Sequence, residues 1–297
     1  MHAAPRCSAW PGPLESPSPG RRSMQKTVLT RECIYRSVAG RELKALIFAP
    51  AELQPGERRP AMLCMHGGAW TSGDRTVPSY MAQRLAARGF VVMSIDFRMA
   101  PAHQYPASLR DANYAIRWLR RHADEYGVDA ARIGGLGFSS GGHLILLAAM
   151  RPAHADYVAD IPDELRDFDA QLSWVITCSG VLDPLARYRM AQEAAYADIL
   201  ACHKQYFGSE AIMREGNPPL LLERGEAAEL PPLLMFQGSA DPRLPADTAT
   251  RMATLYQAAG GVAAAHYYPG LGHSLGEWPA SALDEVADRI QAFAERL

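Results

Sequence analysis

Short apolar runs alternate with amphipathic segments along most of the chain, and this pattern predicts its regular elements. The first two runs, residues 28–38 and 41–48, flank Gly40 and are expected to form a hairpin. The later runs are short, continuous and aliphatic, which is typical of strands that are buried on both faces of a sheet. Six such strands are predicted, at residues 61–65, 90–95, 133–138, 174–178, 233–237 and 263–268.

The segments between the later strands are predicted to be helices. Two of them end at a glycine, Gly89 and Gly127, as helices commonly do. Strands and helices in regular alternation predict an α/β fold with a mostly parallel, eight-stranded sheet and helices on both of its faces. Ligands bind such sheets at the carboxyl ends of the strands. The predicted helices cover residues 78–88, 108–126, 142–150, 247–259 and 281–297.

A long insertion between the sixth and seventh predicted strands interrupts this alternation. Residues 182–230 contain a helical pattern at 185–206 and then a stretch of prolines and glycines. Insertions of this length commonly form a lid or a substrate-binding cap. We therefore expect residues 24–297 to form one domain with a cap. Four aromatic residues of the insertion are candidates either for lining the site or for ordinary helix packing: Tyr188, Tyr196, Tyr206 and Phe207.

Composition narrows the class of protein. The 297 residues are 48% hydrophobic and 21% charged, as in an ordinary globular domain. A net charge of −2 with both signs interspersed argues against a surface for nucleic acid, and no apolar run approaches the roughly 20 residues of a membrane span. Residues 1–23 are rich in proline, lack the apolar core of a signal peptide and are predicted to be a disordered tail, with Met24 as an alternative start.

The cysteines and histidines have no metal-binding spacing. The nine histidines contain no H-E-x-x-H pattern, so no metal is predicted, and no cofactor either. The cysteines are odd in number, widely spaced and without a C-x-x-C pair, so they are expected to be free thiols in a reducing compartment. A cytoplasmic location is predicted on this basis. The five are Cys7, Cys33, Cys64, Cys178 and Cys202.

The stretch from Gly137 to Gly141 joins the fifth predicted strand directly to a helix. A strand that becomes a helix within one residue forces that residue into a strained conformation, and glycines two positions before and after it relieve the crowding. Ser139 stands at this turn, with its hydroxyl expected at the carboxyl end of the strand. Ser139 is therefore the predicted nucleophile. A glycine-rich turn without chemistry is the alternative for so short a pattern.

A serine nucleophile needs a base, and the base needs an orienting carboxylate. His273 follows the last predicted strand in a loop with two glycines and is the predicted base. His143, one helical turn after Ser139, is predicted to be structural. Asp241 follows the seventh predicted strand and is the predicted carboxylate. The alternatives are Asp247, which is explained better as a helix N-cap, and the weaker candidates Asp183 and Asp96.

Acyl transfer also needs backbone N–H groups aimed at the oxygen that becomes negatively charged. Gly67 and Gly68 follow the third predicted strand, and their lack of side chains lets a substrate approach the backbone. These N–H groups and that of Ser140 are predicted to form an oxyanion hole. The predicted nucleophile, carboxylate and base follow one another along the chain in the order expected of α/β-hydrolases.

Several motifs carry a family resemblance: His66-Gly67-Gly68, Asp96-Phe97-Arg98-Met99-Ala100-Pro101, Tyr105-Pro106-Ala107, residues 111–119 and Gly137 to Leu144. From about residue 60 onward the chain resembles the α/β-hydrolase esterases, close to the hormone-sensitive-lipase-like and the feruloyl and acetyl-xylan esterase-like (BD-FAE-like) branches. The resemblance implies that Trp70 and Tyr105 border the substrate pocket.

Three positions depart from the lipase-like branch. That branch usually has a glycine where Ala69 stands, an acidic residue where Phe138 stands and an asparagine where His143 stands. The pattern at Phe138 and His143 is more similar to the feruloyl and acetyl esterases and to the arylformamidases.

These features together predict a cofactor-free serine carboxylesterase that acts on small or medium acyl esters through an acyl-enzyme. The predicted partner is a small-molecule ester, with no nucleic acid and no membrane span. An amidase or arylformamidase with the same triad is the alternative among hydrolases. A binding module without activity is a further alternative, but such modules typically lack the serine or the histidine, and both are present here.

Overall fold

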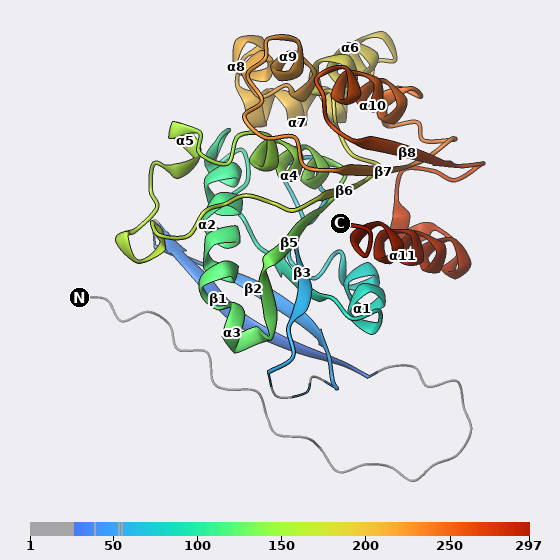
Figure 1. Cartoon of the computed structure of the whole chain (residues 1–297). Helices are drawn as coiled ribbons and strands as arrows, with labels where there is room; N and C mark the ends of the chain where they lie inside the picture. Colours follow the sequence, from blue (N-terminus) through green and yellow to red (C-terminus); the bar gives the residue numbers. More distant parts are fainter. Residues whose placement is uncertain (1–26, 39, 53, 55) are drawn as a thin grey trace.

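The computed structural model describes residues 27–297 apart from 39, 53 and 55, so the predicted tail at 1–23 lies outside the described residues. An eight-stranded sheet runs in the order β1-β2-β4-β3-β5-β6-β7-β8 (Figure 1). The pairs β1–β2 and β2–β4 are antiparallel and the other pairs are parallel, so the prediction of a mostly parallel sheet is confirmed. The strands are β1 Val28–Val38, β2 Arg41–Pro50, β3 Arg59–Met65, β4 Val91–Ile95, β5 Val128–Phe138, β6 Val175–Cys178, β7 Leu233–Gly238 and β8 Ala263–Tyr268.

Helices cover both faces of the sheet, as predicted (Figure 1). Successive residues of β4 show the reason, because side chains alternate across a strand. Val92 belongs to the apolar cluster that includes helices α1 and α11, whereas Val91 and Met93 belong to the cluster that includes α2, α4 and α10. Each helix among the described residues is too short or too polar to cross a membrane. The helices outside the insertion are α1 Ser79–Ala87, α2 Ala107–Arg121, α3 Ala123–Tyr126, α4 Ser140–Met150, α5 Ala155–Val158, α10 Thr248–Ala258 and α11 Ala280–Ala294.

The insertion between β6 and β7 contains four helices that lie together on one side of the molecule (Figure 1). The predicted helix at 185–206 is in fact two helices, because Ala195 between them has φ 55° and turns the chain. The predicted helix at 108–126 is also divided, at His122, into α2 and α3. The helices of the insertion are α6 Pro184–Glu193, α7 Ala197–Phe207, α8 Glu210–Glu215 and α9 Pro218–Glu223.

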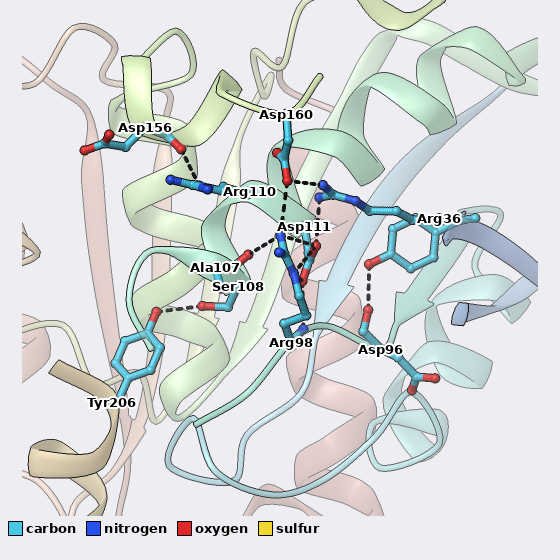
Figure 2. A network of polar contacts seen from close by, with 11 residues as sticks. Arg36, Asp96, Arg98, Ala107, Ser108, Arg110, Asp111, Asp156, Asp160 and Tyr206 are labelled. Carbon is cyan, nitrogen blue, oxygen red and sulfur yellow. Dashed lines mark hydrogen bonds and ion pairs between the residues drawn. The ribbon is translucent and has the colours of Figure 1, made fainter. Parts of the chain in front are cut away.

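A buried network of ion pairs fixes the loop after β4 (Figure 2). Asp111 of α2 is fully buried and accepts hydrogen bonds from Arg36 of β1 and from Arg98 after β4. Asp160, which is partly exposed, contacts both guanidinium groups. Removing one partner of a buried ion pair leaves an uncompensated charge, so these contacts hold β1, α2 and the loop after β4 in one arrangement.

Candidate active site

Ser139 lies at the turn between β5 and α4, at the carboxyl end of the parallel strands. Its backbone has φ 49° and ψ −117°, a strained conformation for a residue with a side chain. A Cβ on Gly141 would lie 2.2 Å from the backbone oxygen of Met65, and one on Gly137 would lie 2.4 Å from the backbone oxygen of Gly141. Only glycine fits at these two positions, which is the physical basis of the G-x-S-x-G pattern.

A continuous series of hydrogen bonds links Ser139, His273 and Asp241. Ser139 Oγ lies 2.8 Å from His273 Nε2, and His273 Nδ1 lies 2.8 Å from Asp241 Oδ2. A carboxylate only accepts hydrogen bonds, so Nδ1 carries the proton and Nε2 accepts from the serine hydroxyl. The Asp241 side chain is 1% exposed and that of His273 is 17% exposed. The fold thus brings together three side chains that are 134 and 32 residues apart in the chain.

The loops that follow β7 and β8 carry Asp241 and His273 to the elbow. These strands are parallel neighbours, so their carboxyl ends lie side by side. Gly238 at the end of β7 allows the two loops to touch, because a Cβ there would lie 2.1 Å from the backbone oxygen of Leu271. The backbone N–H of Arg243 donates to Asp241 Oδ1 over 2.8 Å. The second oxygen of the carboxylate is therefore fixed by its own loop.

His143 has structural contacts of its own. It is fully buried, accepts from the Trp70 indole N–H at Nδ1 over 3.2 Å and donates from Nε2 to the backbone oxygen of Gly216 over 2.7 Å. Burial lowers the pKa of His143 to about 4, so the ring is neutral at physiological pH. Both ring nitrogens are occupied in packing α4 against its surroundings, in agreement with the structural role predicted for this residue.

The other candidate carboxylates have different surroundings. Asp183 caps α6 through its side chain and also accepts from Asn217. Asp96 accepts from both the backbone and the side chain of Arg75, and so fixes a loop as predicted. Asp247 stands at the N-cap position of α10, but its side chain makes no capping hydrogen bond. The N-cap interpretation is therefore correct for the position of Asp247 and wrong for its side chain.

The loop after β3 lies against the elbow. Gly67 is so close that a Cβ on it would lie 3.2 Å from the Cβ of Ser139. Gly68 has φ 119°, and a Cβ on it would lie 1.9 Å from a backbone oxygen of the same loop. Ala69 and Trp70 follow with φ 51° and 62°. Two consecutive left-handed residues are strained, and such strain persists only where neighbouring groups hold the backbone in place.

Aromatic side chains of the insertion hold Trp70. The indole is 1% exposed, stacks on the Tyr206 ring with centroids 5.1 Å apart and planes 5° apart, and meets His203 and Phe207 edge to face. Burial lowers the pKa of His203 to about 3, so this ring is neutral as well. Tyr206 also shares a 2.6 Å hydrogen bond with Ser108 at the start of α2 (Figure 2). Contacts from the insertion therefore hold the loop after β3 in place.

This aromatic cluster was not predicted from the sequence. Tyr206 and Phe207 were candidates either for lining the site or for helix packing. Both side chains are buried, so both belong to the packing. Tyr105 meets the edge of the Tyr206 ring and shares a 2.9 Å hydrogen bond with Tyr157. The predicted place of Trp70 and Tyr105 beside a substrate stays a prediction. No local pattern marks a cluster whose members come from three separate segments, so contacts of this kind follow only from the fold.

A strand-to-helix elbow in a mostly parallel sheet, with a histidine and a carboxylate on two later strand-end loops, defines the α/β-hydrolase class. The family model BD-FAE matches residues 47–255, which is more than half of the chain. The chain therefore belongs to the BD-FAE family. The matched span includes Ser139 and Asp241 and ends before His273.

Two curated relatives of this chain are named as esterases. Esterase LipC of Mycobacterium tuberculosis is 31% identical over 199 residues, which cover 66% of this chain and 47% of LipC. Esterase LipQ of the same organism is 27% identical over 231 residues, which cover 77% of this chain and 52% of LipQ. The chain thus spans about half the length of these relatives. The predicted resemblance to α/β-hydrolase esterases is confirmed.

The structural likeness covers more of both molecules. Propionate-bound esterase 2 of Thermogutta terrifontis has a TM-score of 0.71 and 27% identity, over 89% of this chain and 93% of that chain. The same esterase phosphonylated by sarin has a TM-score of 0.72 and 28% identity, over 88% of this chain and 93% of that chain. The likeness to these enzymes thus extends over most of the chain rather than over the elbow alone.

Proposed function

We propose that the protein is a serine carboxylesterase that hydrolyses small or medium acyl esters. The observation that carries the proposal is the pair of 2.8 Å hydrogen bonds that joins Ser139 to His273 and His273 to Asp241. The esterase relatives support the reaction class. Esterase 2 of Thermogutta terrifontis has been solved with propionate and with butyrate bound, which supports a short acyl group for this chain as well.

In the proposed mechanism, Ser139 Oγ attacks the ester carbonyl while His273 Nε2 takes its proton. Asp241 holds the imidazole with Nδ1 protonated and stabilises the imidazolium that forms. His273 then gives the proton to the leaving alcohol, and a water molecule repeats the sequence on the acyl-enzyme. Activity is expected to fall at acidic pH, because a protonated imidazole cannot accept the serine proton.

The proposed oxyanion hole takes donors from two elements. The N–H of Ser140 belongs to the first turn of α4, where the unpaired N–H groups of a helix favour negative charge. The other donor is the N–H of Gly67 or Gly68 in the loop after β3, and the close approach of Gly67 to Ser139 supports this assignment. Such donors are effective because they are held in place before the charge develops.

We also propose that residues 24–297 form one domain and that the insertion, 182–230, acts as its cap. The packing of α7 on Trp70 in the loop after β3 supports this role. A cytoplasmic location is proposed because Cys64 and Cys178 are buried free thiols, whose pKa burial raises.

A fluorophosphonate probe tests the nucleophile directly. The wild-type protein is expected to be labelled and to hydrolyse p-nitrophenyl butyrate, and Ser139→Ala is expected to lose both properties. Ser140→Ala keeps the backbone N–H and removes a buried hydroxyl that has no hydrogen-bond partner in residues 27–297 as far as they are described, so it is expected to be labelled. A wild-type protein that is not labelled would contradict the proposal. Slower hydrolysis of the ester than of the matching anilide would favour an amidase instead.

A further inference from the structure

Arg187, on helix α6 of the insertion, is a buried cation near Asp241. It is 2% exposed, and Nη1 is buried with no hydrogen-bond partner among the described residues. Arg187 forms no ion pair with any carboxylate of the part of the chain that the structure describes. Burial lowers the pKa of Arg187 to about 10, so the guanidinium is still charged at neutral pH. A buried charge without a direct partner is costly and calls for a physical explanation.

A short series of hydrogen bonds connects Arg187 to the predicted catalytic base. Arg187 Nε donates to the backbone oxygen of Arg243 over 2.9 Å. The backbone N–H of the same residue donates to Asp241 Oδ1 over 2.8 Å, and Asp241 Oδ2 accepts from His273 Nδ1 over 2.8 Å. Helix α6 is thus tied to the loop that fixes the carboxylate.

The hydrogen bond alone does not account for the charge, because a neutral side chain with one N–H would satisfy the same carbonyl oxygen. The nearby charge of Asp241 favours the protonated form of Arg187. Electrostatic interaction is mutual, so the buried guanidinium also acts on the hydrogen-bonded pair of Asp241 and His273.

Other charged and titratable groups also face Arg187. Arg243 has the largest electrostatic effect among them and disfavours the charged guanidinium, while Asp198, which forms an ion pair with Arg243, favours it. Cys202 and His203 face it from α7. His203 is neutral at physiological pH, since burial and the guanidinium itself lower the pKa of this ring to about 3.

We propose, on the basis of the hydrolase mechanism proposed above, that Arg187 is a positioning residue with two separable effects. Its Nε holds the loop that orients Asp241. Its charge disfavours the imidazolium form of His273, so that the base stays neutral and active to a lower pH. Helix α6 of the insertion therefore influences the orientation of Asp241 and the protonation of His273, in addition to its proposed role in the cap.

Three substitutions separate the two effects. Arg187→Gln keeps an N–H at the same distance along the side chain as Nε and removes the charge. Arg187→Met removes both, and Arg187→Lys keeps the charge. The acidic limb of the kcat/KM profile is expected to move to higher pH by about half a unit to one unit in the Gln and Met variants and to stay in place in the Lys variant. On the plateau of the profile, kcat/KM is expected to fall about ten-fold or more in Arg187→Met, because this variant loses the hydrogen bond to the backbone oxygen of Arg243. Arg187→Gln keeps that hydrogen bond and is expected to keep its plateau kcat/KM.

Arg189 supplies matched controls. It is exposed on the same helix, so Arg189→Gln and Arg189→Met are expected to leave the profile unchanged. An acidic limb that stays in place in both neutral Arg187 variants would overturn the effect of charge. An equal loss of plateau kcat/KM in the Gln and Met variants would overturn the role of the hydrogen bond. If Arg187→Met does not fold, the Gln variant still decides the effect of charge.

A measurement without turnover keeps this inference distinct from the proposed function. The titration of His273 can be followed by NMR of its ring C–H signals in the wild-type protein and in Arg187→Gln. A higher midpoint in the variant supports the inference even for a protein that hydrolyses no ester. An unchanged midpoint overturns it even for an active esterase. Failure of the esterase assignment itself would be seen separately, as a wild-type protein that the fluorophosphonate probe does not label.

Discussion

At the scale of single residues, the site depends on a strained serine and on two side chains that are placed by strand ends. The left-handed backbone of Ser139 turns its hydroxyl toward His273, and the glycines at 137 and 141 make that turn sterically possible. Asp241 is the most buried of the three, and each of its oxygens accepts a hydrogen bond. The imidazole is therefore fixed in both orientation and tautomer.

Replacing Asp241 by asparagine is expected to lower kcat/KM by about 10³ to 10⁴-fold, although the shape of the site is kept. An amide N–H that faces Nδ1 favours the tautomer with the proton on Nε2, which cannot accept from the serine. Ester hydrolysis at varied substrate concentration measures the loss. Asp247→Asn is the matched control, because it makes the same change at the rival carboxylate, and it is expected to have nearly wild-type activity. The opposite result would assign the carboxylate role to Asp247.

At the scale of elements, the insertion holds two loops of the site in place. Helix α7 packs Tyr206 and Phe207 around Trp70, whose own backbone is left-handed. Helix α6 contacts the carboxylate loop through Arg187. The proposed oxyanion hole and the triad therefore both depend on a segment that is far from them in the sequence.

Removal of the Tyr206 ring is expected to impair both stability and catalysis. Tyr206→Ala leaves a cavity beneath Trp70, so we expect a loss of about 3–5 kcal/mol in the free energy of unfolding. A fall in kcat of about ten-fold or more is also expected, because the loop that carries the proposed oxyanion donors is no longer held. Urea unfolding and ester hydrolysis measure the two effects.

Tyr206→Phe is the control for the ring itself. It keeps the stack on Trp70 and loses the 2.6 Å hydrogen bond to Ser108, for which about 1 kcal/mol is expected. Its kcat is expected to stay close to that of the wild type. Equal losses of kcat in the two variants would mean that the hydroxyl, rather than the stacked ring, supports the loop.

At the scale of the whole molecule, polar and aromatic contacts connect parts of the fold that are far apart in the sequence. The ion pairs around Asp111 connect β1 and α2, and the buried imidazoles of His143 and His203 lie between the insertion and the rest of the fold. These imidazoles are neutral when folded, since burial lowers the pKa of His143 to about 4 and that of His203 to about 3. Protonation of these imidazoles at acidic pH is therefore expected to weaken the packing of the insertion on the rest of the fold.

The free energy of unfolding is expected to fall as pH drops from 6.5 toward 4. In the unfolded chain His143 binds a proton near its ordinary pKa of 6.5, and in the folded protein only near 4, so the unfolded state binds more protons between these values. His143 alone accounts for a loss on the order of 3 kcal/mol across this window. Urea unfolding at pH 7 and pH 5 measures the effect. His143→Asn is expected to lose less stability over the same interval, and an equal loss would contradict the assignment.

Much of the fold could be predicted, because a strand that is buried on both faces of a sheet is a continuous apolar run in the sequence. Each of the eight strands lies at a predicted apolar run, with ends that differ by a few residues. The turns that break two predicted helices, at His122 and Ala195, could not be predicted, because neither carries a proline or a glycine. Their position is set by how the flanking helices pack and not by a local preference.

The sequence by itself determined the alternation of strands and helices, the elbow at Ser139 and the strand-end positions of Asp241 and His273. Steric limits on a sharp turn and the topology of a parallel sheet are properties of short segments and of their order, so they can be recognised along the chain. Only the tertiary structure decided the two 2.8 Å contacts, the enclosure of Trp70 by Tyr206 and the tether from Arg187. These depend on distances between segments that are remote in the chain, and packing alone determines such distances.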